Sequence, residues 1–178
     1  DESWINEPVT LIPRMQDWID ANYPDTKLAI SEYNFGGLEH INGAVAQADA
    51  LGIFGREQVD FATLWDPPTS SQPGAYAFRM FRNYDGNGSK FGDGSLPAIS
   101  SAEDDLSVFA AFRTDGTITL IVINKTWDSI DSELALTGSA AESAKRFRYS
   151  SDDLSAIVQL ADIDIVAGKL TEQFPPQS

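Results

Sequence analysis

The chain has 178 residues, of which 42% are hydrophobic, and a formal net charge of −15. The apolar share is sufficient for a folded core, and the acidic surplus disfavours binding to nucleic acid because like charges repel. The absence of cysteine and the single histidine, His40, exclude disulfide frameworks, thiol nucleophiles and histidine-rich zinc sites.

Helical and strand patterns alternate along the first half of the chain. A helix begins near Leu11, where apolar residues recur on one helical face, and ends at Pro24. It is followed by a strand at 27–33, a helix at 41–55, a strand at 59–65 and a helix at 75–84. Two strands joined by a crossover helix pair in parallel, and such a unit cannot cover both faces of its own sheet. The pattern therefore predicts part of a larger α/β sheet or barrel.

The pattern changes near residue 100, where helical periodicity stops. Strand-like alternation fills 105–113 and 117–124 around Asp115-Gly116, a dipeptide typical of a hairpin turn. Further strands are expected at 132–136, 145–149, 156–160 and 170–174. Short strands separated by turn residues favour a β-sandwich. We therefore predict two domains, residues 1–98 with helices and strands and residues 99–178 with strands alone.

Glu32 is the first candidate for chemistry. It lies near the end of the predicted strand 27–33, and strict alternation places it on the same, inward face as Leu28 and Ile30. A carboxylate on an inward face is costly unless it is paired or functional, and the carboxyl ends of parallel strands carry the active site in α/β folds. The alternatives are a glutamate paired with an arginine and a strand end that points to water.

Trp65 ends the neighbouring predicted strand at a similar level to Glu32. A tryptophan at the mouth of a strand can stack its flat apolar face on a sugar ring, and an ordinary core tryptophan is the alternative. Tyr33 and Asn34 follow Glu32 and offer hydrogen bonds to sugar hydroxyl groups or to the carboxylate. His40 is expected to cap or line the following helix.

The glycine-rich loop at 85–98 begins with Asp85-Gly86-Asn87-Gly88-Ser89, whose alternating oxygen side chains partly match a calcium loop. Lys90 stands where a tight calcium loop has glycine, so a turn held by Asx hydrogen bonds is favoured. We expect no cofactor and no metal, with calcium at this loop as the alternative. Two formal N-glycosylation sequons start at Asn87 and Asn124.

Several blocks of the sequence resemble glycoside hydrolase family 44, whose members are endoglucanases and xyloglucanases. One block extends from Ile30 to Gly37 with the sequence ISEYNFGG. Further similar blocks are found at 1–5, 46–49, 51–57, 62–65, 81–86 and 91–93. The resemblance covers nearly the whole chain and weakens after about residue 130.

The resemblance implies that the chain is the C-terminal portion of a (β/α)8 TIM barrel followed by an antiparallel β-sandwich. Glu32 matches the family's catalytic nucleophile on the seventh barrel strand, and Trp65 matches an aromatic residue at the end of the eighth. Trp4 matches a loop tryptophan that lines the same cleft, in which Tyr33 and Asn34 would contact substrate or orient Glu32. The family retains the anomeric configuration, which requires a nucleophile and an acid/base about 5–5.5 Å apart.

The resemblance also implies that a catalytic partner is absent. The family's acid/base glutamate belongs to an earlier barrel strand than those found here, and its sandwich would continue for one more strand after Ser178. We therefore expect a fragment, truncated at both ends, with little or no hydrolase activity by itself.

The expected substrate is a neutral β-glucan of the cellulose or xyloglucan type, and the expected location is extracellular, as for a secreted bacterial enzyme. No apolar run reaches the roughly 18 residues of a membrane-spanning helix, so we expect no membrane span. The main alternative is a noncatalytic carbohydrate-binding β-domain, which needs exposed aromatic residues on one face, where Trp127 is the one tryptophan after Trp65. A second alternative is another α/β enzyme, in which Glu32, Trp65 and Trp4 would not share a cleft.

Overall fold

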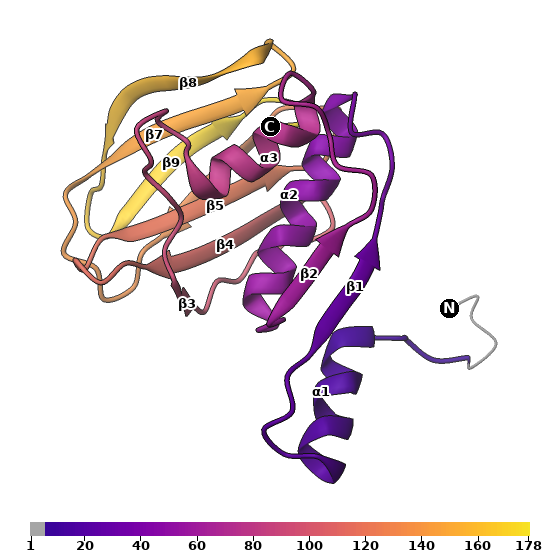
Figure 1. Cartoon of the computed structure of the whole chain (residues 1–178). Coiled ribbons are helices and arrows are strands. Elements are labelled where there is room, and N and C mark those ends of the chain that lie inside the picture. Colours follow the sequence, from indigo (N-terminus) through magenta and orange to yellow (C-terminus); the bar gives the residue numbers. More distant parts are fainter. Residues whose placement is uncertain (1–5) are drawn as a thin grey trace. The chain divides into compact units, whose positions relative to one another are not determined.

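The computed structural model describes residues 6–178 and shows a mixed α/β fold in which strands predominate (Figure 1). The helices are α1 (Leu11–Asn22), α2 (Ile41–Arg56) and α3 (Pro73–Arg82). The strands are β1 (Ala29–Tyr33), β2 (Phe61–Leu64), β3 (Gly94–Leu96), β4 (Leu106–Phe112), β5 (Ile118–Asn124), β6 (Ile130–Ala135), β7 (Ser143–Ser150), β8 (Asp153–Asp164) and β9 (Lys169–Phe174). No helix in residues 6–178 has the length and apolar character that crossing a membrane requires.

The chain forms two compact units, each of which is made of two segments. Unit 1 comprises Asp1–Asn34 and Ile53–Pro67, and unit 2 comprises Phe35–Gly52 and Pro68–Ser178. The two units are therefore not separated by a single boundary near residue 98. The two domains expected at 1–98 and 99–178 stay a prediction.

Unit 1 is organised around the parallel pair β1–β2 (Figure 1). At the start of this ladder the Asp60 carboxylate accepts the backbone N–H of Leu28, and the Asp60 N–H donates to the Leu28 carbonyl oxygen, both over 3.0 Å. The parallel pairing predicted from the crossover helix is confirmed. No described residue of unit 1 is buried, and Trp18 on the apolar side of α1 is 56% exposed.

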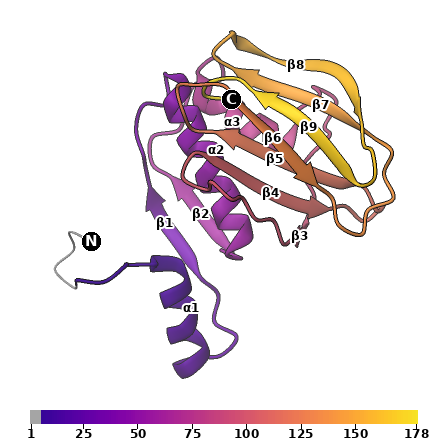
Figure 2. The same cartoon turned by 180° about the vertical axis from the view of Figure 1, so that it is seen from behind.

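Unit 2 contains the remaining strands, all in antiparallel pairs. Strands β3, β4 and β5 form one sheet in that order, β7 pairs with β8, and β6 pairs with β9, as Figure 2 shows from the opposite side. The β4–β5 hairpin turns at Asp115-Gly116, where Gly116 has a φ of 84° that glycine adopts without strain. The strands predicted after residue 100 are confirmed, although β8 is longer than expected. Strand β3 lies in a segment predicted as loop.

The buried apolar core belongs to unit 2. Its members are Leu38, Ala44, Val45, Ala50, Ala77, Leu106, Phe109, Ala111, Ile121, Ile123, Tyr149, Ile165 and Leu170. Helix α2 approaches β4 closely because Gly52 has no side chain, since a Cβ atom there would lie 2.3 Å from the Phe109 ring. In the same helix a Cβ atom on Gly43 would lie 2.0 Å from the carbonyl oxygen of Gly37. Two glycines therefore allow α2 to pack against its neighbours through backbone rather than side chains.

Candidate active site

The carboxyl ends of β1 and β2 bring four predicted site residues to one edge of the unit 1 sheet. The backbone N–H of Trp65 donates a 2.8 Å hydrogen bond to the carbonyl oxygen of Tyr33. Glu32 and Asn34 flank Tyr33 in the chain, so they lie at the same edge as Trp65. This is the edge at which parallel α/β folds place their catalytic groups. The functional roles of the four residues remain predictions.

Strand β1 carries a β-bulge immediately before this edge. The register shifts between Ile30 and Tyr33, because three residue steps along β1 match two along β2. The additional residue falls at Ser31–Glu32, where the Thr63 hydroxyl donates a hydrogen bond to the Ser31 carbonyl oxygen. Bulges bend a strand, redirect its side chains and are frequent next to active sites.

The bulge corrects the expected direction of Glu32. Strict alternation predicted an inward face shared with Leu28 and Ile30, but those two residues are half-buried whereas Glu32 is exposed. The prediction is wrong because the extra residue interrupts the two-residue period, and because a sheet of two strands offers little cover. Within residues 6–178 no hydrogen bond or ion pair engages the Glu32 carboxylate, which excludes a structural glutamate–arginine pair in this part of the chain.

Aromatic side chains accompany this exposed carboxylate. The Tyr33 ring packs edge-on against the Phe54 ring, with centroids 5.0 Å apart and an interplanar angle of 82°. The Trp65 side chain is 62% exposed, and the backbone of Asp66 after it takes a positive φ of 64°. A solvent-accessible carboxylate near an exposed indole face suits an uncharged ligand with apolar C–H surfaces.

Trp4 and His40 were also considered from the sequence. Trp4, expected to line the same cleft, falls outside the described residues. The carbonyl oxygen of His40 accepts the backbone N–H of Ala44 over 3.2 Å, as the residue before a helix does, and its Nε2 atom lies 3.6 Å from a Glu39 carboxylate oxygen. His40 was predicted to cap or line the following helix, and the structure places it immediately before α2.

The Asp85–Ser89 turn is held by side-chain hydrogen bonds of the Asx type. One carboxylate oxygen of Asp85 accepts the backbone N–H groups of Asn87 at 2.9 Å and Ser89 at 3.0 Å, and the other accepts the Ser89 hydroxyl at 2.6 Å. These donors, the hydroxyl first, lower the pKa of Asp85. The Asx-turn prediction is confirmed. No cluster of three or more metal-ligating side chains occurs in the described part of the chain, and the expectation of no cofactor stays a prediction.

Asn124, which starts a formal sequon, is fully buried. Its amide nitrogen donates to the carbonyl oxygens of Asp128, Phe174 and Pro175, and its amide oxygen accepts the backbone N–H and hydroxyl of Thr126. Every hydrogen-bonding group of the side chain is used, so Asn124 ties the turn after β5 to the C-terminal segment and offers no site for a glycan.

Comparison with known proteins shows which enzymes the chain is similar to. A curated relative, Endoglucanase A of Paenibacillus lautus, is 36% identical over 182 residues, covering 99% of this chain and 26% of the relative. A solved bifunctional glucanase-xylanase from a metagenome library superposes with a TM-score of 0.93 at 42% identity, covering 99% of this chain and 34% of that one. A Paenibacillus polymyxa xyloglucanase from glycoside hydrolase family 44 superposes with a TM-score of 0.88 at 32% identity, covering 99% and 36%.

The resemblance to glycoside hydrolase family 44 is confirmed. A second solved family 44 enzyme, an endoglucanase from Clostridium acetobutylium, superposes with a TM-score of 0.87 over 94% of this chain. The chain spans about a third or less of each of these relatives. No protein-family model matches it.

Proposed function

We propose that this chain is a segment of a retaining endo-β-1,4-glycanase and that Glu32 is the catalytic nucleophile. The observation that carries the proposal is the position of an exposed Glu32 at the carboxyl end of β1, one residue before the Tyr33 carbonyl that binds the Trp65 N–H. The printed names of similar proteins, which include endoglucanases, a xyloglucanase and a glucanase-xylanase, support this class of reaction.

In the proposed reaction a carboxylate oxygen of Glu32 attacks the anomeric carbon and the glycosidic C–O bond breaks. An acid/base carboxyl group, contributed by a part of the longer protein that is not in this chain, gives its proton to the leaving oxygen. Water then attacks the anomeric carbon and returns a proton to the acid/base group, which releases the sugar with retained configuration and restores Glu32.

The architecture of the proposed enzyme follows from the same resemblance. Strands β1 and β2 would be the seventh and eighth strands of a (β/α)8 barrel, and the strands of unit 2 would form an antiparallel β-sandwich. The exposed face of Trp65 and the loop residue Trp4 would stack on sugar rings, while Tyr33 and Asn34 orient the substrate or Glu32. A neutral β-glucan is compatible with the net charge of −15, which would repel an anionic polymer. Because the proposed substrate is a polymer, the proposed location of the enzyme is outside the cell.

The decisive experiment is covalent labelling with a 2-fluoro-cellobioside that carries a dinitrophenyl leaving group. Dinitrophenolate departs without a proton, so the bond from the Glu32 oxygen to the anomeric carbon can form, and the bond from that carbon to the phenolic oxygen can break, without the acid/base group. We expect one adduct by intact mass, mapped to the peptide that contains Glu32 and absent from Glu32→Gln. A full-length version labelled elsewhere, and not at Glu32, would overturn the nucleophile assignment.

The alternative of a noncatalytic carbohydrate-binding domain has one supporting observation, the 76% exposure of Trp127 in unit 2. A binding domain does not use Glu32, so a protein of that kind would show no labelling at this residue either alone or in the full-length version. Labelling of the full-length version alone would instead mean that the role is correct and that the cleft needs the rest of the barrel.

A further inference from the structure

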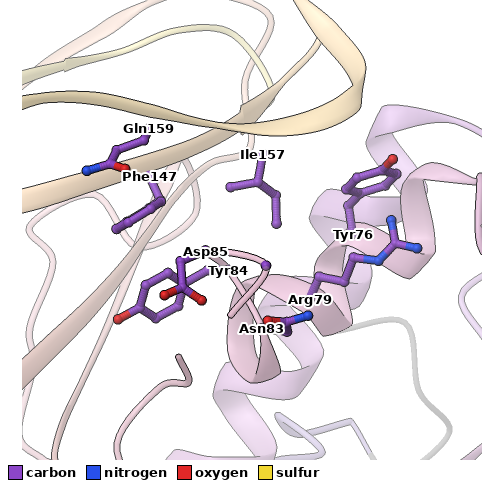
Figure 3. Close-up of a pocket in the computed structure, with 9 residues that line it drawn as sticks. Tyr76, Arg79, Asn83, Tyr84, Asp85, Phe147, Ile157 and Gln159 are labelled. Carbon is purple, nitrogen blue, oxygen red and sulfur yellow. The ribbon is translucent and has the colours of Figure 1, made fainter. Parts of the chain in front are cut away.

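A hollow of about 340 Å³ lies in unit 2, among residues that the proposed catalytic site does not use (Figure 3). Its lining comprises Tyr76, Arg79, Asn83, Tyr84, Asp85, Gly86, Phe147, Ile157 and Gln159. The volume lies at the small end of the range of about 300–1,000 Å³ for ligand pockets. We propose that this hollow is a secondary binding site for a neutral glucan chain, an inference that rests on the proposed glycanase function.

The two walls of the hollow come from regular elements. Phe147 on β7 is directly opposite Gln159 on β8, and Ile157 is two residues before Gln159, so the three side chains share one face of the hairpin. On the other wall Tyr76 and Arg79 are three residues apart on α3 and therefore lie on one face of that helix. Figure 3 shows Tyr76 and Arg79 across the hollow from Phe147 and Gln159.

Direct contacts hold the two walls in place. The Tyr76 hydroxyl donates a 2.5 Å hydrogen bond to the Ser155 carbonyl oxygen on β8, and the Tyr76 ring stacks on the Tyr149 ring with centroids 4.6 Å apart and an interplanar angle of 6°. Tyr84 contacts Phe147 with ring centroids 4.7 Å apart. These contacts join α3 and the loop after it to β7 and β8, so the hollow exists before a ligand arrives and binding needs little ordering of the protein.

The charged groups of the hollow are already engaged within the protein. The Arg79 guanidinium lies 4.3 Å from the centroid of the Tyr76 ring and donates to the Ser70 carbonyl oxygen over 2.7 Å. Both Asp85 carboxylate oxygens accept hydrogen bonds from the turn that begins at that residue. The lining carries one positive and one negative charge and therefore has no net charge. It cannot offset the repulsion of an anion by the chain, whose formal net charge is −15. A metal cation would find no free carboxylate here.

The remaining surface suits a sugar. Phe147 and Tyr84 offer ring faces and edges to the C–H groups of a pyranose, and Ile157 extends the apolar area. The side-chain amide of Gln159 is exposed and makes no hydrogen bond within residues 6–178. It therefore offers both a donor and an acceptor to hydroxyl groups of a ligand. Half-buried rings beside an uncommitted amide bind an uncharged, hydroxyl-rich ring in preference to a nucleotide or an acidic sugar.

The test is affinity electrophoresis of the 178-residue chain in native gels that contain xyloglucan, with cellohexaose as soluble competitor. We expect the wild-type chain to be retarded, and Gln159→Ala and Phe147→Leu to weaken association about three- to tenfold, as loss of one hydrogen bond or one ring contact does. Gln173→Ala, an exposed strand glutamine outside the hollow, is the matched control and should migrate like wild type. Circular dichroism of each variant verifies that it is folded.

Two results would overturn the secondary site. One is a wild-type chain that xyloglucan does not retard, and the other is retardation that survives Gln159→Ala and Phe147→Leu but disappears with Trp65→Ala. The second result would place sugar binding at the strand ends of unit 1. Neither result bears on the nucleophile, because covalent labelling at Glu32 is measured independently and should be unchanged in Gln159→Ala.

Discussion

Trp65 and Tyr33 are joined by a main-chain hydrogen bond of 2.8 Å between the N–H of the first and the carbonyl oxygen of the second. Glu32 immediately precedes Tyr33, so this bond sets the spacing between the proposed nucleophile and the proposed stacking residue. Backbone rather than side-chain contacts determine that spacing. Substitution of either side chain should therefore change chemistry or binding without moving the other group.

The first prediction concerns the close approach of α2 to β4. Gly52→Ala should lower the free energy of unfolding by about 1–3 kcal/mol, because the new methyl group would overlap the Phe109 ring in a packed core. Thermal or urea unfolding measures the effect. Gly55→Ala in the same helix is the matched control, since nothing lies within 4 Å of its added Cβ atom, and it should raise stability by about 0.5–1 kcal/mol. Equal effects of the two substitutions would contradict the packing of Gly52 on Phe109.

The second prediction concerns Glu172, a largely buried carboxylate that binds two arginines. Its oxygens accept hydrogen bonds from Arg146 and from Arg148, the latter over 2.7 Å, and its side chain is 10% exposed. Glu172→Gln should cost about 2–4 kcal/mol because it leaves two guanidinium groups without a counter-charge. In urea unfolding, the exposed pair of Glu133 and Lys169 supplies the comparison, and Glu133→Gln should cost less than about 1 kcal/mol. A Glu172→Gln variant as stable as Glu133→Gln would argue against the pairing of Glu172 with both Arg146 and Arg148.

The third prediction concerns alkaline pH. Burial, with a smaller contribution from Tyr76, raises the pKa of Tyr149 to about 12, and its hydroxyl donates to the Leu154 carbonyl oxygen. A phenol whose folded-state pKa exceeds its unfolded value of about 10 stabilises the fold fully below pH 10. That contribution is lost as the pH rises from about 10 to about 12. Ultraviolet absorbance of tyrosinate should therefore show Tyr149 ionising only as the chain unfolds.

Tyr149→Phe provides the test of this assignment. The variant should lack the late ionisation step and show a shallower loss of stability between pH 10 and pH 12. Tyr23→Phe is the control, because Tyr23 is 73% exposed and its replacement should leave the unfolding profile unchanged. If Tyr23→Phe removed the late ionisation step, the assignment of that step to Tyr149 would be wrong.

The fourth prediction concerns the activity of the chain alone. Reducing-sugar assays on xyloglucan or carboxymethylcellulose should give rates about 10²–10⁴ lower than those of a full-length family 44 enzyme, since general acid catalysis contributes a factor of that size. Azide, which can attack a glycosyl-enzyme without base assistance, should not restore turnover of the polymer because the first step still lacks its acid. Rates equal to those of the intact enzyme would show that another carboxyl group in this chain serves as acid/base.

Much of the secondary structure could be predicted from local signals. The Asp115-Gly116 turn between alternating runs predicted the β4–β5 hairpin, and the crossover helix predicted that β1 and β2 are parallel. The juxtaposition of Glu32 and Trp65 followed from the second of these, because the carboxyl ends of parallel strands share an edge. The family resemblance followed from sequence blocks and is confirmed by the superpositions.

Tertiary contacts, which no local pattern encodes, account for what was missed. The bulge in Ala29–Tyr33 has no glycine or proline to mark it, so strict alternation gave Glu32 the wrong face. The hollow could not be predicted because Phe147 and Gln159 are far from α3 in the sequence. They line one hollow with α3 only because β7 pairs with β8 and Tyr76 contacts β8. Strand β3 has three residues, too few to show a period.

The lack of any buried side chain in the described part of unit 1 has a kinetic consequence. The amide protons of β1 and β2 are protected mainly by their own ladder, whereas those of β4 and β5 lie over the core around Phe109. Opening of the β1–β2 ladder exposes little new apolar surface, so its free energy should be a small fraction of that for global unfolding. In deuterated buffer the edge that presents Glu32 and Trp65 should therefore exchange its amides well before the core does, unless the rest of a longer chain packs upon it.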